Sequence, residues 1–321
     1  MLSRIAESLF WMGRYLERAD DTARILDVEL HRFLEGPGLD QGPVIRGLLG
    51  ALGVDEVAAS RTSVYEVVGR LSFDAALPGS IISSVTYARE NGRGIRESIS
   101  SELWECVNVT YHSVGAISAR ADSMGPHDYF SFARMVRERA ALASGIAETT
   151  MPRDEGWSFF TLGRSIERVD MTVRLIGLAE VVRGSRRDWM ATLRSCSALE
   201  AYLRSYGGAV EGSKVLEFLL LDRLFPRSVH FSLSAAEAAL AEIAPSAGRI
   251  GTTGEAQRAI GRAKAAIELR EIGEILDSLP EILILIESAC SSASTALARR
   301  FFRGAGLESW RHEDVRGKAH A

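Results

Sequence analysis

The chain has 321 residues, of which 46% are hydrophobic and 25% are charged, and its formal net charge is −4. These are ordinary values for a globular protein, so they argue against a disordered chain or a fibre. A mildly acidic chain also gives no overall electrostatic reason to bind nucleic acid or an acidic membrane, so we expect neither partner.

The hydrophobic pattern has a helical period along almost the whole chain. The predicted helices lie at 3–34, 43–52, 62–71, 80–90, 94–117, 128–150, 155–182, 187–206, 213–221, 228–243, 253–276 and 279–303. No run alternates with the two-residue period of a β-strand, so we predict an all-α protein. Residues 304–321 lose the apolar period, and we predict that they form a flexible tail.

Two segments far apart in the chain carry the same charged pattern. GRYLERADDTAR at 13–24 and GRSIERVDMTVR at 163–174 share a Gly-Arg pair, a Glu-Arg pair, and Asp, Thr and Arg at matching positions. LSFDAALPGSIISSV (71–85) and FLLLDRLFPRSVHFS (218–232) also match, with a shared Asp, Pro and Ser at nearly the same offset. Two matches at nearly one offset predict an internal duplication.

The duplication predicts the domain organisation. The chain exceeds the size at which a single core usually stops growing, so two similar units are a natural solution. We expect two helical-bundle repeats, 1–150 and 151–303, that are related by a pseudo-twofold axis and fused into one compact unit.

In the first charged motif most of the ionic residues occupy one sector of a helix whose remaining circumference is mostly apolar, and the second motif repeats this pattern. Arg18 is the exception, because it points away from that sector toward another element. Such a helix is normally buried, and buried charges must be paired because an isolated buried ion is costly. Each motif has three arginines and two matched acids, which leaves one arginine over. Its partner is either an acid on another helix, such as Glu97 or Glu102, or an anionic ligand.

Three interpretations of the motifs stay open. They are a buried ladder that fixes the register of two packed halves, a ligand-binding or catalytic polar centre, and an exposed partner-binding face. If the centre is catalytic, Glu17 and Glu167 are the candidate general acid and base. The candidate binding residues in the motifs are Arg14, Arg18, Arg24, Arg164, Arg168 and Arg174.

Residues 89–108, RENGRGIRESISSELWECVN, have no convincing counterpart in the second half. Three of their arginines fall on one helical face if the helix continues through two glycines, and such a cluster can bind carboxylate or phosphate. The alternative is a solvated amphipathic helix. The candidate binding residues here are Arg89, Asn91, Arg93, Arg96, Glu102, Trp104 and Asn108.

Other chemistry is sparse. The sequence has no ExxH, GxSxG, Walker A or Rossmann glycine motif, and Asp27 and His31 lack further ligands nearby in sequence, so we predict no metal and no cofactor. The three cysteines are isolated, as expected of reduced thiols in the cytoplasm. We expect no secretion signal, and no membrane span because the most apolar stretch, 281–298, is short and interrupted by Glu287.

The segments LSRIAESLFWMGRYLERADDTARIL, ARENGRGIRESISSELWECVN, FPRSVHFSL and WSFFTLGRSIERVDMTVRL resemble the bacterial alpha-E family, in the same order and over nearly the whole chain. That family is an all-helical domain with a recurring Glu–Arg motif, which here corresponds to Glu17–Arg18 and Glu167–Arg168. The resemblance implies a context beside, or fused to, circularly permuted ATP-grasp amidoligase-like proteins, with transglutaminase-like proteins as further neighbours.

That context points to a pathway that makes, modifies or removes peptide or amide bonds. Our first hypothesis is an accessory protein that docks on the ATP-grasp partner and binds its anionic peptide or acyl intermediate through the Arg/Glu centre. The second is an enzyme of the same pathway that uses Glu17 or Glu167 as general acid or base. The third is a structural scaffold. The sequence leaves catalysis and the oligomeric state open.

Overall fold

A computed structural model of the chain describes residues 1–35, 42, 45, 48–50, 52, 63–181, 185–245 and 254–302. All regular elements in these residues are helices, so the all-α prediction is confirmed for the described part of the chain. The longer helices are α1 (Ser3–Glu35), α3 (Val64–Phe73), α4 (Ile81–Arg93), α5 (Ser101–Ser118), α6 (Pro126–Thr150), α7 (Glu155–Val181), α8 (Arg186–Ser195), α9 (Leu199–Tyr206), α10 (Gly212–Leu221), α11 (Val229–Ile243), α12 (Glu255–Glu268), α13 (Ile272–Asp277) and α14 (Leu279–Phe301). Two 3-10 turns, η2 (Arg96–Ser98) and η3 (Ala121–Ser123), connect helices of the first half.

Three predicted helices are interrupted. The helix predicted at 94–117 begins only at α5, because α4 ends at Arg93 and the Ser100 hydroxyl caps the new helix by accepting from the Leu103 N–H. The helix predicted at 187–206 breaks at Ser197, whose φ of 51° lies in the left-handed region. The helix predicted at 253–276 divides into α12 and α13.

Two further expectations fall partly or wholly outside the described residues. Half of the residues of the helix predicted at 43–52 lie outside them, and 45 and 48–50 within it are helical. All of the tail predicted at 304–321 lies outside the described residues.

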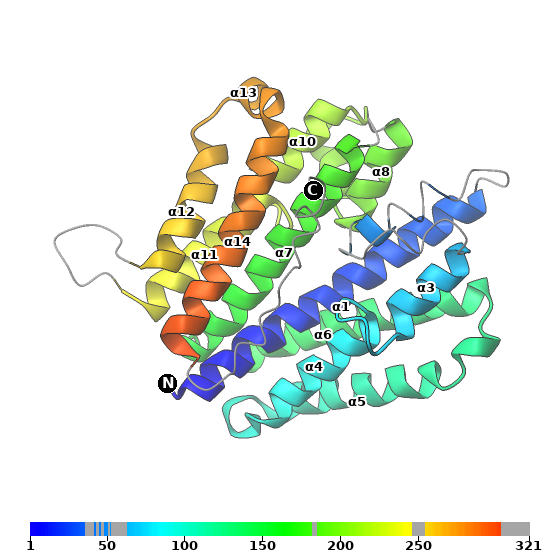
Figure 1. Cartoon of the computed structure of the whole chain (residues 1–321), viewed down its shortest axis with the longest axis vertical. Coiled ribbons are helices and arrows are strands. Elements are labelled where there is room, and N and C mark those ends of the chain that lie inside the picture. The colour runs from blue at the N-terminus through cyan, green and yellow to red at the C-terminus, as the bar shows by residue number, and fades with distance from the viewer. Residues whose placement is uncertain are drawn as a thin grey trace, which may run out of the picture.

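Two long helices form the centre of the molecule (Figure 1). α1 and α7 pack against each other, and each also packs against two helices of its own half: α1 against α4 and α6, and α7 against α11 and α14. α5 joins α4 to α6 as α12 joins α11 to α14. The packing order is thus the same on both sides, as a duplication predicts, while the duplication itself stays a prediction.

The crossing of α1 and α7 depends on two glycines. A Cβ atom on Gly13 would collide with the carbonyl oxygen of Phe160, and one on Gly163 would collide with that of Phe10. The helix backbones therefore touch at this crossing, and only glycine permits that approach. The close approach brings the charged residues that follow each glycine within reach of the opposite helix.

The last helix, α14, corrects an expectation from sequence. It runs for 23 residues, and its length and composition would be enough to cross a membrane. The expectation that this apolar stretch is too short for a membrane span was therefore wrong. A buried core helix of a globular protein can have the same length and composition. Here Ile282, Ile286, Ala289 and Ala293 are buried, and α14 packs against α12 and α7 as part of the core.

Candidate functional site

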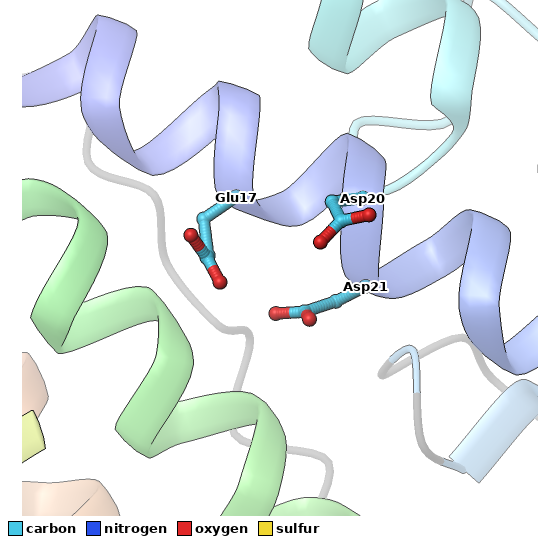
Figure 2. Close-up of side chains that lie close together, drawn as sticks. All are labelled: Glu17, Asp20 and Asp21. Carbon is cyan, nitrogen blue, oxygen red and sulfur yellow. The ribbon is translucent and has the colours of Figure 1, made fainter. Parts of the chain in front are cut away.

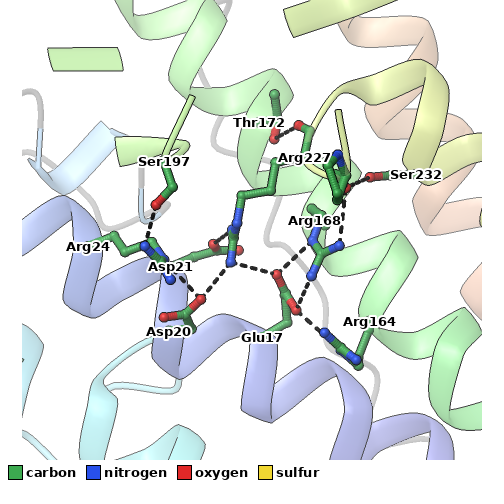
Figure 3. Close-up of polar contacts among 11 residues, drawn as sticks. Glu17, Asp20, Asp21, Arg24, Arg164, Arg168, Thr172, Ser197, Arg227 and Ser232 are labelled. Atoms are coloured by element: carbon green, nitrogen blue, oxygen red, sulfur yellow. Dashed lines mark hydrogen bonds and ion pairs between the residues drawn. The ribbon is translucent and has the colours of Figure 1, made fainter. Parts of the chain in front are cut away.

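The repeated motifs meet where α1 crosses α7, and each holds the glutamate of the other. The Glu167 carboxylate accepts from Arg14 Nε at 2.7 Å and from Arg18 Nε and Nη2 at 2.5 and 2.8 Å. Reciprocally, the Glu17 carboxylate accepts from Arg168 Nε and Nη2, both at 2.8 Å, and from Arg164 Nε at 3.4 Å (Figure 3).

This exchange identifies the partner of the surplus arginine in each motif as the glutamate of the other motif. The glutamate and the arginine of each Glu–Arg pair both bind the opposite helix. Glu97 and Glu102, which we considered as partners from sequence, are exposed, and no ion pair involving them is found among the described residues.

Burial and pairing determine the protonation of the two glutamates. Burial alone raises the pKa of Glu167, but the charges and hydrogen bonds of Arg18 and Arg14 outweigh it and bring the pKa to about 2. Burial opposes ionisation of Glu17 too, and Arg168, Arg227 and Arg164 together hold its pKa below the usual range. A carboxylate that stays ionised at neutral pH is a poor general acid and a weak general base.

A further arginine, Arg227, enters this centre from the turn before α11. Its Nη2 lies 2.5 Å from Asp20 Oδ2 and 3.1 Å from Glu17 Oε1, and its Nη1 donates to Asp21 (Figure 3). Sequence reasoning missed this residue because Arg227 precedes the Ser228 cap and has no place in a helical charge pattern.

The repeats nevertheless contain a signal for Arg227. In the second sequence match, Arg227 is aligned with Gly79, and the two positions are equivalent in the structure. The Thr22 hydroxyl donates to the Gly79 carbonyl at 3.4 Å, and the Thr172 hydroxyl donates to the Arg227 carbonyl at 3.2 Å. An arginine opposite a glycine is a difference that the two halves do not share.

A matching difference lies on the central helices. Asp21 in the first motif is aligned with Met171 in the second. The additional acid on α1 is therefore met by the additional arginine before α11, whereas the other half has methionine and glycine at these places. Asp21 and Arg227 thus form a charge pair that has no counterpart at the aligned positions Met171 and Gly79.

Glu17, Asp20 and Asp21 form an acidic cluster (Figure 2), in which one carboxylate oxygen from each residue lies within 4.8 Å of the other two. The distances would suit a cation, but the Arg227 guanidinium is bound to all three carboxylates and supplies the positive charge. Burial is the main cause that raises the pKa of Asp21 to about 7. Arg227 opposes this shift, and the neighbouring Glu17 and Asp20 charges add to it.

The remaining motif arginines pair within their own helices. Arg24 Nε donates to Asp20 Oδ2 at 2.9 Å, and Arg174 lies 3.1 Å from Asp170. Arg24 also donates to the hydroxyl of Ser197, the residue with left-handed backbone between α8 and α9. The arginines of both motifs are therefore in ion pairs with acids of this centre.

The second group of candidates lies apart from this centre, on α4, η2 and α5. Arg89 Nε donates to Asn108 Oδ1 at 2.9 Å, and its guanidinium lies 4.6 Å from the Tyr111 ring centroid. Arg89 and Arg96 both approach the Trp104 ring, at 5.8 and 4.4 Å. We call these five residues the α4–α5 surface.

The other predicted binding residues of this segment, Asn91, Arg93 and Glu102, are not part of the α4–α5 surface. Because α4 ends at Arg93, the three arginines do not share one helical face. Arg93 is 58% exposed and pairs with Glu90 at 2.7 Å. Asn91 donates to the carbonyl of Tyr87 at 2.8 Å, and Glu102 is exposed on the first turn of α5.

Comparison with known proteins agrees with the central place of the Glu–Arg pairs. A family model described as a predicted alpha-helical domain with a conserved ER motif matches residues 1–302. Two curated relatives are "Uncharacterized protein Mb2597" of Mycobacterium bovis and "Uncharacterized protein Rv2567" of Mycobacterium tuberculosis. Each is 28% identical over 267 aligned residues, which cover 76% of this chain and 30% of the relative. No solved structure matches the chain.

Proposed function

The chain belongs to the Alpha-E family, and on that basis we propose that it is a non-catalytic accessory protein of a pathway that forms or modifies amide bonds. In this proposal it docks in the cytoplasm on an ATP-grasp amidoligase-like protein and contacts that partner's anionic peptide or acyl intermediate. A transglutaminase-like protein is a further candidate partner.

One observation favours an accessory role over catalysis. Glu17 and Glu167 are the glutamates of the two Glu–Arg pairs. Both are buried, and each is bound by at least two arginines. An acid–base catalyst needs a pKa near the working pH and access to its substrate. The lowered pKa of each glutamate and its burial oppose both requirements, so the pairs are suited to bracing the crossing of α1 and α7.

The ligand contact is assigned to the α4–α5 surface because the motif arginines are already paired. Arg96 is exposed over Trp104, and Arg89 lies between Trp104 and Tyr111. Arginine and tryptophan are enriched among the residues that dominate binding at protein interfaces. Arg89 is already paired with Glu90 at 2.6 Å. Arg96 forms no ion pair with any residue that the structure describes, so its guanidinium keeps an edge free to bind a carboxylate or a phosphate.

The α4–α5 surface is also connected to the braced centre. Tyr87, on the same helix as Arg89, is 41% exposed, and its ring lies 5.1 Å from the ring of Tyr15. The Tyr15 ring in turn lies 5.7 Å from the Arg18 guanidinium. A rigid crossing of α1 and α7 therefore supports the surface that we propose for docking.

The length of the relatives supports work with other domains. The aligned region makes up 30% of each mycobacterial protein, so in those proteins a domain of this kind is part of a longer chain. A module that functions beside other domains needs a docking surface more than an active site of its own.

Co-purification with an ATP-grasp amidoligase-like protein of the same organism tests the proposal. The purified pair is then assayed for ATP-dependent ligation with and without this chain. We expect a stable complex and ligation that depends on the chain, and Arg96→Ala to weaken both. Arg262 is an exposed arginine on α12, so Arg262→Ala is the matched control and should behave like the parent. Failure to form a complex, or ligation that is indifferent to the chain, would refute the accessory role.

A further inference from the structure

A pocket of about 410 Å³ lies between the C-terminal half of α1 and the N-terminal half of α6, and it shares no lining residue with either group described above. Figure 1 shows these two helices side by side. The residues that line the pocket are Asp27, His31, His127, Phe130, Ser131, Arg134 and Arg137. Its volume is within the usual range for sites that bind small molecules.

The helical period explains why these side chains converge. The five residues from α6 are spaced by three, one, three and three positions, so they follow one face of that helix. Asp27 and His31 are four apart on α1 and face them. The packing of α1 on α6 therefore brings His127 beside a pair that is isolated in the sequence.

Part of the pocket is already paired and held in place. Arg137 Nη1 donates to Asp27 Oδ2 at 2.7 Å, which neutralises the only acid in the lining. His31 Nδ1 lies 2.8 Å from the Asp27 carbonyl oxygen, and the His31 ring lies 4.2 Å from the Phe130 ring. The wall on the α1 side is thus preorganised.

The rest of the pocket has donors without acceptors. Arg134 is exposed and forms no ion pair with any residue that the structure describes. Arg137 Nε is buried and has no hydrogen-bond partner within the described residues, which is costly for a polar atom. The lining therefore combines one uncompensated guanidinium with an unsatisfied N–H, and the Ser131 hydroxyl is a further donor.

From this arrangement we propose that the pocket binds the phosphate group of a small phosphorylated molecule. Guanidinium groups match the geometry of phosphate oxygens, and two arginines with a serine hydroxyl offer enough donors for three of them. Phe130 supplies an apolar wall for the remainder of the ligand. The same arginines oppose a metal cation. This site is independent of the proposed docking function, since it shares no residue with the α4–α5 surface.

Calorimetric titration of the full chain tests the site, with inorganic phosphate and glycerol phosphate as probes and acetate as the carboxylate comparison. We expect saturable binding of both phosphates that is tighter than binding of acetate. Arg134→Gln should weaken phosphate binding at least about tenfold, since it removes a charged hydrogen bond. Arg262→Gln on α12 removes an equivalent exposed charge far from the pocket and should leave the affinity unchanged.

A second variant guards against loss of folding in the first. Ser131→Glu adds a negative charge to the pocket at an exposed helical position without removing an ion pair, and it should abolish phosphate binding. Circular dichroism checks that both variants remain helical. The proposal is overturned if neither phosphate binds saturably, if acetate binds as well as phosphate, or if folded Arg134→Gln and Ser131→Glu bind like Arg262→Gln.

Discussion

Glu17→Gln removes one negative charge from the crossing of α1 and α7 and keeps the size of the side chain. The substitution leaves Arg168 without its bidentate acceptor, and it leaves Arg164 without the one acid that pairs with it among the described residues. Breaking a buried ion pair by removing one partner costs about 3–5 kcal/mol because the other charge stays buried. The three guanidiniums that pair with Glu17 are at most 20% exposed.

The expected loss corresponds to a drop in melting temperature of roughly 6–20 °C, at about 2–4 °C per kcal/mol for a chain of this size class. Thermal unfolding followed by circular dichroism measures it. Glu211→Gln is the matched control, because its pair with Lys214 is 51% exposed on the glutamate side and surface pairs contribute about 0–1 kcal/mol. If Glu17→Gln melts within the range of Glu211→Gln, the pairs do not brace the crossing.

Three further predictions address the same centre. Gly163→Ala should destabilise the fold by about 1–3 kcal/mol because the new methyl group meets the Phe10 backbone. In Gly145→Ala the new methyl group meets nothing within 4 Å, so this control should stabilise α6 by about 0.5–1 kcal/mol. Equal melting temperatures of the two variants would contradict this prediction. The pKa of Asp21 is about 7 in the folded chain, above the value of about 3.9 expected in the unfolded chain. The folded state therefore binds a proton at this carboxyl more tightly than the unfolded state does. The stability that this proton contributes is fully present below about pH 4 and is lost as the pH rises through 7. Urea unfolding between pH 4 and 8 should therefore show a fall in stability with pH that is smaller in Asp21→Asn, and identical profiles would refute the assignment. Asp21→Met and Arg227→Gly together reproduce the residues of the other half, and the double variant should be more stable than the sum of the single losses by about 0.5–3 kcal/mol; simple additivity would show that the two charges are not coupled.

The periodicity of the sequence was sufficient for the fold class, because a helix records its buried face in residues that are near one another in the chain. It was insufficient at the helix interruptions. The Ser100 cap and the left-handed Ser197 are decided by local hydrogen bonds and by the contact with Arg24 from a distant helix.

The burial and pairing of Glu17 and Glu167 followed from their position on an otherwise apolar helix, but the exchange of partners did not. Spacing within one helix suggests Arg14 for Glu17, whereas the structure pairs Arg14 with Glu167, because two glycines allow the backbones to touch. The pocket could not be predicted from the sequence either, because it too depends on contacts between residues far apart in the chain. His127 is 96 residues from His31, and only the packing of α1 on α6 brings them to one wall.

The central claim is that the Glu–Arg pairs brace the fold and the α4–α5 surface contacts the partner. The most direct measurement compares the affinities of Glu167→Gln and Arg96→Ala for the ATP-grasp protein, at a temperature well below the melting temperature of both variants. We expect folded Glu167→Gln to bind like the parent and Arg96→Ala to bind at least about tenfold more weakly, as at an interface hot spot. The opposite order, with Arg96→Ala unaffected and folded Glu167→Gln unable to bind, would contradict the account.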